Sequence, residues 1–151
     1  MATYPTELIA EWFLRHDLMI REQEGGGISN LKLQKLLYYA QSAHLALCDG
    51  EPLFPEPIFA WKHGPVVRSI YEKYKDNHSD FLFPDCEVDL TCISPDDREI
   101  LSDVYSTFGQ YDAWKLRDMT HSEDPWLTTR ANEIIAPTKM QKYFADHYLS
   151  S

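Results

Sequence analysis

Two residues near the middle of the chain have the spacing of a shared metal site. His44 and Cys48 lie four residues apart, so a helix would place both side chains on one face. A structural zinc site needs further ligands, which the other cysteines and two histidines would have to supply: Cys86, Cys92, His63 and His121. No HExxH or CxxC motif brings such residues together. A histidine within an apolar helix face is more often a hydrogen-bonded core residue, so we expect neither a metal nor a cofactor.

The loop THSEDPW, over residues 120–126, contains side chains that could perform general acid–base chemistry, namely His121, Glu123 and Asp124. The same loop has a structural explanation, because Thr120 can satisfy the end of one helix and Asp124 can cap the next before Pro125. The glycine run at 25–27 lacks the lysine and the serine or threonine of a phosphate-binding loop. The residue types and their spacing therefore favour a protein that is not an enzyme.

These side chains depend for their positions on a central helix, which we expect over residues 28–47. Three glycines at 25–27 break the chain before it, and Gly50 and Pro52 follow where a helix end is expected. Ser29 or Asn30 can cap the helix, because either side-chain oxygen can accept from a free N–H of the first turn. Steps of three and four residues lay an apolar stripe along it, made by Leu33, Leu36, Leu37, Ala40, Ala43, His44 and Leu47.

The remaining sequence predicts more helices and a small ribbon. Helices are expected over residues 6–21, 65–75, 95–108, 112–119, 124–131 and 138–149, with Pro65 first in its helix, Ser94 as a cap and a capping box of Thr138 and Gln141. Residues 86–93 alternate apolar and polar side chains, which is typical of a half-exposed strand that could pair with residues 58–61. The expected fold is mainly α: a single domain over residues 1–151, with about six or seven helices around the central helix and a small antiparallel β ribbon.

The composition is typical of a soluble globular protein. Of the 151 residues 44% are hydrophobic, and no run approaches the roughly 18 apolar residues that a membrane span needs. The start, MATYPTEL, lacks the basic and apolar segments of a secretory signal. Three cysteines without CxxC spacing indicate reduced thiols. We therefore expect a cytoplasmic protein that does not bind membranes.

The net charge of −10 is concentrated in one part of the chain. Residues 76–124 contain thirteen acidic and three basic side chains, whereas the segments on either side are nearly neutral. Such a field repels a phosphate backbone, so direct binding of nucleic acid is disfavoured. It favours a partner protein with a basic surface, although an acidic surface can also serve solubility alone.

Two tryptophans adjoin polar turns. Trp61 precedes the turn KHGP, and Trp126 follows the loop THSEDP. Aromatic side chains beside rigid turns often anchor protein partners. The same residues could instead close the core around the central helix, and the two interpretations are compatible.

Several stretches together resemble the Panacea domain, the SocA-like antitoxin domain that also occurs in phage-associated GepA-type proteins. They are ISNLKLQKLLYYAQSAHLAL, PLFPEPIFAWKHGPVVRSIY, Phe108–Gly109 with Tyr111, and LRDMTHSEDPW. The order is that of the family and extends to Tyr143 and Phe144. Met119 stands where the pattern more often has leucine, and residues 76–93 contain no motif that aligns.

The resemblance implies an antitoxin of a prokaryotic or phage toxin–antitoxin pair that binds and neutralises a cognate toxin protein. Members of the family neutralise toxins of unrelated kinds. At least one branch acts as a proteolytic adaptor that delivers its toxin to the ClpXP protease. Some members carry an additional DNA-binding domain, for which this chain has no room.

Matching the family motif by position gives a set of protein-binding candidates: Lys32, Lys35, Tyr39, Trp61, His63, Gly64, Pro65, Thr120, His121, Glu123 and Trp126. Gly64 and Pro65 are expected to shape a turn and a helix start. The two lysines and the two histidines of this set have no evident structural role, so we expect them on a functional face.

Two other functions remain open. An acidic phage accessory protein could mimic DNA and block a host DNA-binding protein. A small enzyme could use His63 or His121, which would require a pocket that joins them.

Overall fold

The computed structural model describes residues 3–24, 27–77 and 80–149, so part of the expected glycine break at 25–27 lies outside the described residues. Within these ranges the fold is mainly helical, with seven α-helices and a two-stranded antiparallel sheet, which confirms the predicted class. The elements are α1 (Thr6–Glu24), α2 (Asn30–Leu47), β1 (Phe59–Trp61), β2 (Gly64–Val66), α3 (Arg68–Tyr74), a 3₁₀ turn (Lys75–Asn77), α4 (Pro95–Phe108), α5 (Ala113–His121), α6 (Asp124–Leu127) and α7 (Pro137–Tyr148).

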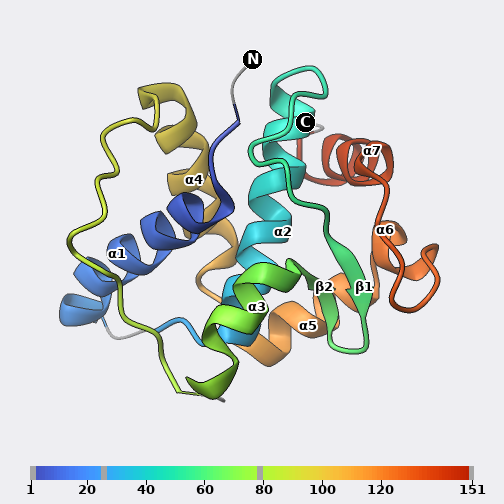
Figure 1. The fold of residues 1–151 in the computed structure, drawn as a ribbon. Coiled ribbons are helices and arrows are strands. Elements are labelled where there is room, and N and C mark those ends of the chain that lie inside the picture. The colour runs from blue at the N-terminus through green and yellow to red at the C-terminus, as the bar shows by residue number, and fades with distance from the viewer. Residues whose placement is uncertain (1–2, 25–26, 78–79, 150–151) are drawn as a thin grey trace.

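Helix α2 lies at the centre, as predicted. It contacts α1, α3, α4, α5, α7 and β2, which surround it on all sides (Figure 1). Fifteen of its eighteen residues are buried. The burial includes polar residues that the apolar-stripe pattern places at the surface, and it sets the main requirement of the fold: each of these polar groups needs a partner inside the protein.

Three helix starts follow the side-chain capping rule. Ser29 accepts from the Lys32 amide at 3.3 Å, Ser94 from that of Asp97 at 3.2 Å, and Asp112 from that of Lys115 at 2.8 Å. The capping box expected for the last helix is wrong. Helix α7 begins at Pro137, one residue before Thr138, and Ala136 precedes it without a side-chain cap. Asp124 is likewise the first residue of α6 and not its cap.

The β ribbon differs from the prediction. β1 pairs with β2, with Phe59 opposite Val66 and Trp61 opposite Gly64. Pro65 therefore lies in a strand, and α3 begins only at Arg68. The other edge of β1 is occupied by residues 132–135, because the Ala60 amide donates to the Glu133 carbonyl at 2.9 Å.

Residues 86–93 consequently form turns instead of a strand. Both edges of β1 are occupied, so the strand expected as their partner is not available to pair with them. The segment is attached to α1 by Arg15, whose Nη2 donates to the carbonyls of Asp85 (3.1 Å) and Val88 (2.7 Å). Alternation of apolar and polar side chains alone therefore gave a wrong strand prediction here.

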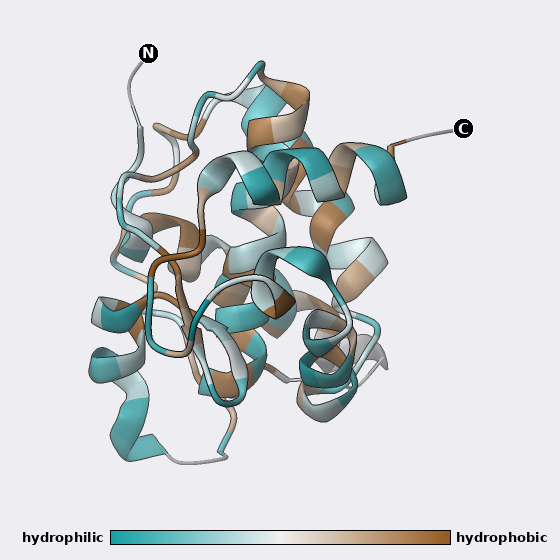
Figure 2. Ribbon diagram, turned by 90° about the vertical axis from the view of Figure 1, so that its right-hand side faces the viewer, coloured by the Kyte–Doolittle hydropathy of each residue, from teal (hydrophilic) through white to brown (hydrophobic). Residues whose placement is uncertain are grey.

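The outer helices are amphipathic. Figure 2 views the molecule from the side of α7, where hydrophobic and hydrophilic residues alternate along this helix. Its apolar face, with Met140 and Phe144 buried, packs on α2. Among the described residues, no helix has the length and apolar character needed to cross a membrane.

A buried carboxylate joins three helices. Glu123, between α5 and α6, is 3% exposed and accepts hydrogen bonds from the hydroxyls of Tyr38 (3.0 Å), Tyr39 (2.8 Å) and Tyr148 (2.7 Å). Burial raises the pKa of Glu123, and the three hydroxyls oppose that shift. These bonds connect α2 with α7 and with the start of α6.

We predict that Glu123→Leu destabilises the fold by about 3–5 kcal/mol, because it leaves three hydroxyls without their acceptor. Tyr148→Phe, which removes one donor, should cost about 1 kcal/mol. The exposed neighbour Asp124→Asn serves as the control and should stay within about 0.5 kcal/mol of the wild type. Urea unfolding followed by tryptophan fluorescence measures all three. Equal stabilities for the Leu and Asn variants would contradict a structural role for Glu123.

Candidate protein-binding groove

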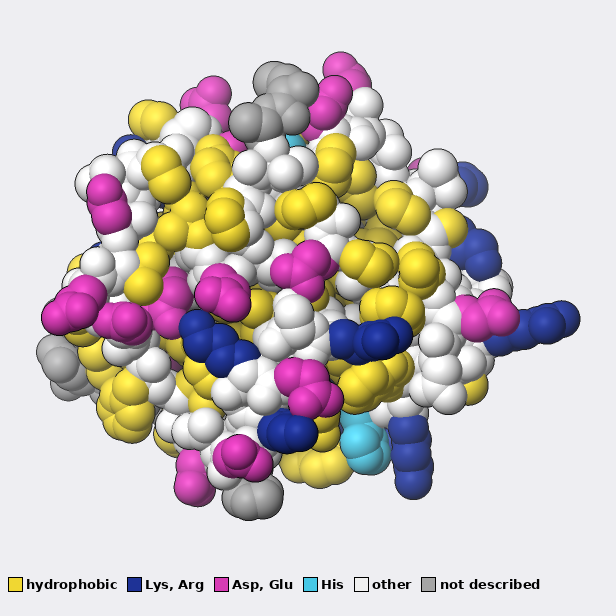
Figure 3. Space-filling model, in the orientation of Figure 1, with side chains coloured by type: hydrophobic (Ala, Val, Ile, Leu, Met, Phe, Trp, Pro, Cys, Tyr) yellow, Lys and Arg dark blue, Asp and Glu magenta, His cyan; other side chains and the backbone are white. Residues whose placement is uncertain are grey.

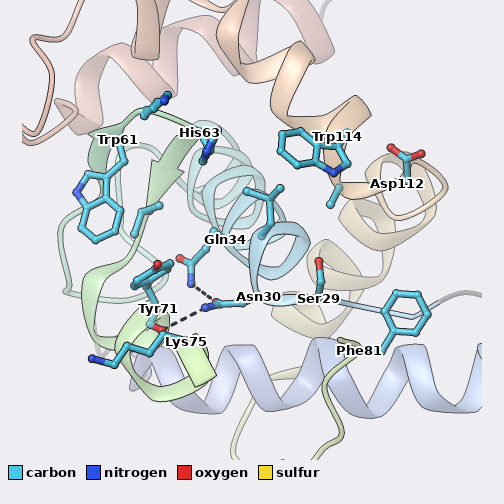
Figure 4. A pocket seen from close by; sticks show the side chains of 14 residues that line it. Ser29, Asn30, Gln34, Trp61, His63, Tyr71, Lys75, Phe81, Asp112 and Trp114 are labelled. Atoms are coloured by element: carbon cyan, nitrogen blue, oxygen red, sulfur yellow. Dashed lines mark hydrogen bonds between the residues drawn. The ribbon is translucent and has the colours of Figure 1, made fainter. Parts of the chain in front are cut away.

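A groove of about 590 Å³ opens between the start of α2, the β1–β2 hairpin, α3 and α5 (Figure 4). Two aromatic pairs form opposite walls. Trp61 meets Tyr71 edge to face with 5.0 Å between ring centres, and His63 meets Trp114 in the same way at 5.7 Å. Phe81 closes a third side. Trp114 and Phe81 are 58% and 52% exposed, which is unusual for such large apolar side chains.

The floor of the groove is a chain of hydrogen bonds from α2. Gln34 accepts from the Val67 amide at 2.9 Å and donates to Asn30 at 2.9 Å. Asn30 in turn donates to the Tyr71 carbonyl at 3.2 Å. These polar groups are thus engaged within the protein, so the floor holds the hairpin and α3 in fixed positions.

The hairpin packs tightly on α2 and α5. The backbone of Gly64 has φ +107°, which L side chains rarely adopt. A Cβ at this position would lie 2.7 Å from Lys35 Cε and 2.8 Å from Thr120 Oγ1. Lys35 Nζ donates to the Pro65 carbonyl at 3.2 Å, and Thr120 donates to the Arg117 carbonyl at 2.9 Å. Gly64 is therefore required for both the turn and the close packing.

The second motif tryptophan supports the hairpin from the other side. Trp126 Nε1 donates to the Trp61 carbonyl at 2.8 Å, and its ring lies 4.1 Å from that of His121. His63 lines the groove, whereas His121 is packed beside Trp126 and is not part of its lining. The enzyme alternative requires a pocket that joins the two histidines, and this groove does not join them.

The lysines do have structural roles, and that part of the sequence interpretation is wrong. Lys32 is 6% exposed and donates from Nζ to the Gly109 carbonyl at 2.7 Å, which holds the end of α4. Lys35 is fully buried beneath the hairpin. Tyr39, Thr120 and Glu123 are also buried. Of the predicted site residues, only Trp61 and His63 line the groove.

Trp114 is the groove residue that sequence reasoning missed. It lies on α5 outside the expected buried positions, which are Ala113, Leu116 and Met119. A tryptophan on the polar side of a short amphipathic helix is a signal of a binding surface that could have been used. Phe81 lies in the segment without a recognisable motif, so no local pattern pointed to it.

The hairpin end of the groove is positively charged. Arg117 Nε donates to His63 Nδ1 at 3.1 Å, so this nitrogen carries no proton. Loss of hydration, followed by the charges of Arg117 and Lys62, lowers the pKa of His63. Burial, and then Arg117, lowers the pKa of Lys35 to about 7.

Acidic side chains lie mainly elsewhere. Figure 3 shows many of them gathered where the segment 80–94 and α4 lie in Figure 1, with lysine and arginine along the opposite edge. We call the exposed carboxylates of this region the acidic surface; it comprises Asp80, Asp85, Glu87, Asp89, Asp96, Glu99 and Asp103.

The lowered pKa of Lys35 predicts that the contribution of this residue to stability changes with pH. In the unfolded chain Lys35 keeps its proton up to its ordinary pKa of 10.5, whereas the folded chain releases it above about 7. The unfolded state thus binds more protons between these values, and the contribution of Lys35 to stability rises with pH. The unfolding free energy of the wild type minus that of Lys35→Met should therefore increase with pH across this window, by at most about 1.4 kcal/mol per pH unit.

Urea unfolding at about pH 6.5, 8 and 9.5 measures this difference. The exposed Lys115→Met on the same side of the molecule is the control, and its difference from wild type should not change with pH. A constant difference for Lys35→Met would show that the folded protein keeps this lysine protonated throughout.

Comparison with known proteins agrees with the motif positions. The family described as "Antitoxin SocA-like, Panacea domain" matches residues 33–127, which include most of α2 and all of the hairpin, α5 and α6. Antitoxin SocA of Caulobacter vibrioides (strain NA1000 / CB15N) is 34% identical over 110 residues, which are 66% of this chain and 58% of the relative. The chain therefore spans less than two thirds of the length of that curated relative. No solved structure matches this chain. On the family match, this chain belongs to the SocA-like antitoxins that carry the Panacea domain.

Proposed function

We propose that this chain neutralises a cognate toxin by direct binding, and that the toxin docks over the groove bounded by Trp61, His63 and Trp114. One observation carries the location: the motif residues beneath the hairpin hold it rigid, while these three side chains line the opening above it. The family supports the antitoxin role in general.

The chemistry of the groove suits a protein partner. Tryptophan and tyrosine are enriched among residues that dominate binding energy. A groove whose walls are already fixed by packing and hydrogen bonds loses little conformational freedom on binding. Its volume also falls within the range of small-molecule sites. The large exposed parts of Trp114 and Phe81 favour a protein surface, which could cover both rings at once.

The acidic surface adds a charge preference to this proposal. It begins at Asp80, next to Phe81 in the groove wall, and Asp112 lines the groove on the side of α5. A toxin with a basic face, as proteins that hold phosphates have, would meet these carboxylates while it occupies the groove. The exposed carboxylates of residues 76–124 would then contribute to recognition in the cytoplasm.

The family resemblance also implies a more specific mechanism of neutralisation, in which the antitoxin delivers the toxin to the ClpXP protease. It requires that toxin and protease bind at the same time, whereas blocking requires the toxin alone. The half-life of the toxin in cells separates the modes: delivery shortens it when the antitoxin and ClpX are both present, and blocking leaves it unchanged.

The first test is co-expression with the product of the neighbouring gene, using that neighbour alone as the control. We predict that the neighbour arrests growth and that this chain restores it. Trp114→Ala should weaken the measured affinity at least about tenfold and reduce the rescue, because it removes one wall of the groove. Met19→Ala on α1, where the methionine is 64% exposed, is the matched surface control and should bind as the wild type does.

The outcomes separate function from location. A harmless neighbour, or no rescue by the wild-type chain, contradicts the antitoxin proposal for this pair. Competition with duplex DNA for one host protein would then favour the DNA-mimic alternative. Rescue by wild type and by Trp114→Ala to the same extent keeps the function and rejects the groove as the docking site.

The charge preference has its own test. The affinity for the toxin should fall as salt rises to about 0.5 M, because exposed charge pairs are screened within a few ångströms at that ionic strength. Replacing three carboxylates of the acidic surface together, by Asp80→Asn, Glu87→Gln and Glu99→Gln, should flatten this dependence. Glu133→Gln, at an exposed carboxylate beyond the acidic surface, should leave it unchanged. An affinity that does not respond to salt contradicts the electrostatic part of the proposal alone.

A further inference from the structure

Three potential metal ligands meet where α2 ends and α4 begins, away from the groove. His44 and Cys48 come from the end of α2, and Asp97 from the first turn of α4. One ligand atom from each, a ring nitrogen, the thiol sulfur and a carboxylate oxygen, lies within 4.8 Å of the other two. Among the described residues these are the one group of this kind. Figure 1 shows the N-terminal segment passing between the two helices here.

Hydrogen bonding fixes the orientation of the His44 ring in this cluster. His44 Nδ1 lies 2.6 Å from the Glu51 carbonyl oxygen, which can only accept, so Nδ1 carries the proton. In a neutral imidazole Nε2 then has a lone pair, and it lies 3.1 Å from Asp97 Oδ1, another acceptor. Nε2 and Asp97 Oδ1 therefore face the same space, as two ligand atoms of one metal ion do.

The surroundings suit the metal ion. A metal-bound histidine usually donates its other ring N–H to an acceptor such as a backbone carbonyl. The bond from Nδ1 to the Glu51 carbonyl does this here and leaves Nε2 free to bind a metal. Asp97 is oriented in the same way, since the Tyr4 hydroxyl donates to its Oδ2 at 2.7 Å. Three further carboxylates, those of Asp49, Asp96 and Glu51, also act electrostatically on Cys48 and give the cluster a negative field that favours a cation.

We propose that His44 Nε2, Cys48 Sγ and one oxygen of Asp97 bind a zinc ion. Nitrogen, sulfur and oxygen are the ligand atoms that zinc takes in proteins, and in a tetrahedral site they lie about 3.3–3.6 Å from one another. The His44–Asp97 distance of 3.1 Å is close to this value, and the Cys48 sulfur lies within 4.8 Å of both other ligand atoms. Water can take the fourth position. The ion would connect the end of α2 to the start of α4.

The helical spacing of His44 and Cys48 indicates the first half of this site, whereas no local sequence pattern points to its third ligand. The cluster uses a carboxylate that is distant in sequence, on the helix that Ser94 caps. Only the packing of α4 against α2 brings it near.

The test uses the purified full chain and cobalt(II) as a spectroscopic probe for zinc. A site with one thiolate should give a sulfur-to-cobalt charge-transfer band together with the visible bands of tetrahedral cobalt, and zinc should remove both by displacement. We expect one zinc per chain by calorimetry and a rise of roughly 5 °C in the thermal unfolding midpoint when zinc is in excess. Asp97→Asn should weaken binding at least about tenfold.

Cysteine variants provide the matched control. Cys48→Ser should abolish the charge-transfer band, whereas the double variant Cys86→Ser/Cys92→Ser, which removes the two exposed thiols, should keep it. Circular dichroism checks that each variant is folded. Absence of the band in the wild type, or its loss in the double variant, overturns the proposal. The contact of His44 with Asp97 would then be a direct interaction between the two side chains alone. Neither result depends on the toxin, so the outcome is independent of the antitoxin proposal.

Discussion

A central helix without a solvent-exposed face depends on internal hydrogen bonds for every polar side chain that it carries. Helix α2 is in this situation, and several of its buried polar groups bind different parts of the chain. Lys32 holds the end of α4, Lys35 the hairpin and Gln41 the backbone at Leu53 and Phe54. An unpaired polar group at such depth would cost about 1–3 kcal/mol. The polar residues of α2 therefore determine where the surrounding segments lie as much as its leucines do.

This constraint explains why the candidate site is rigid although little regular structure surrounds it. The hairpin has only three residues in each strand, which would be marginal by itself. It is held by Lys35 from below, by Trp126 from the side and by residues 132–135 along its free edge. Trp61 and His63 are thus presented on a scaffold whose position is set by contacts elsewhere. The cationic Arg117 and the exposed ring of Trp114 complete the opening from α5.

The sequence was sufficient for features that depend on local chemistry. The central helix, the caps at Ser29 and Ser94 and the mainly helical class follow from periodicity and capping rules. The strand partners of residues 59–61 were not predicted, because Gly64–Val66 carries no alternating strand pattern and residues 132–135 are distant in sequence. The roles of Lys32 and Lys35 were missed for a related reason. Lysine is almost never fully buried, and only the enclosure of α2 from all sides makes these two exceptions.

The positions of a family motif in such a fold therefore do not identify the binding surface. Most of its residues in this chain, including Lys35, Thr120 and Glu123, are buried and hydrogen-bonded. Their replacement would first disturb the hairpin or the helix packing, and a loss of toxin binding would then follow from lost structure. Trp114 has the opposite properties, since it is largely exposed and its ring contacts lie at the groove opening. Loss of binding with unchanged stability can therefore identify a contact residue here, whereas loss of both identifies part of the scaffold.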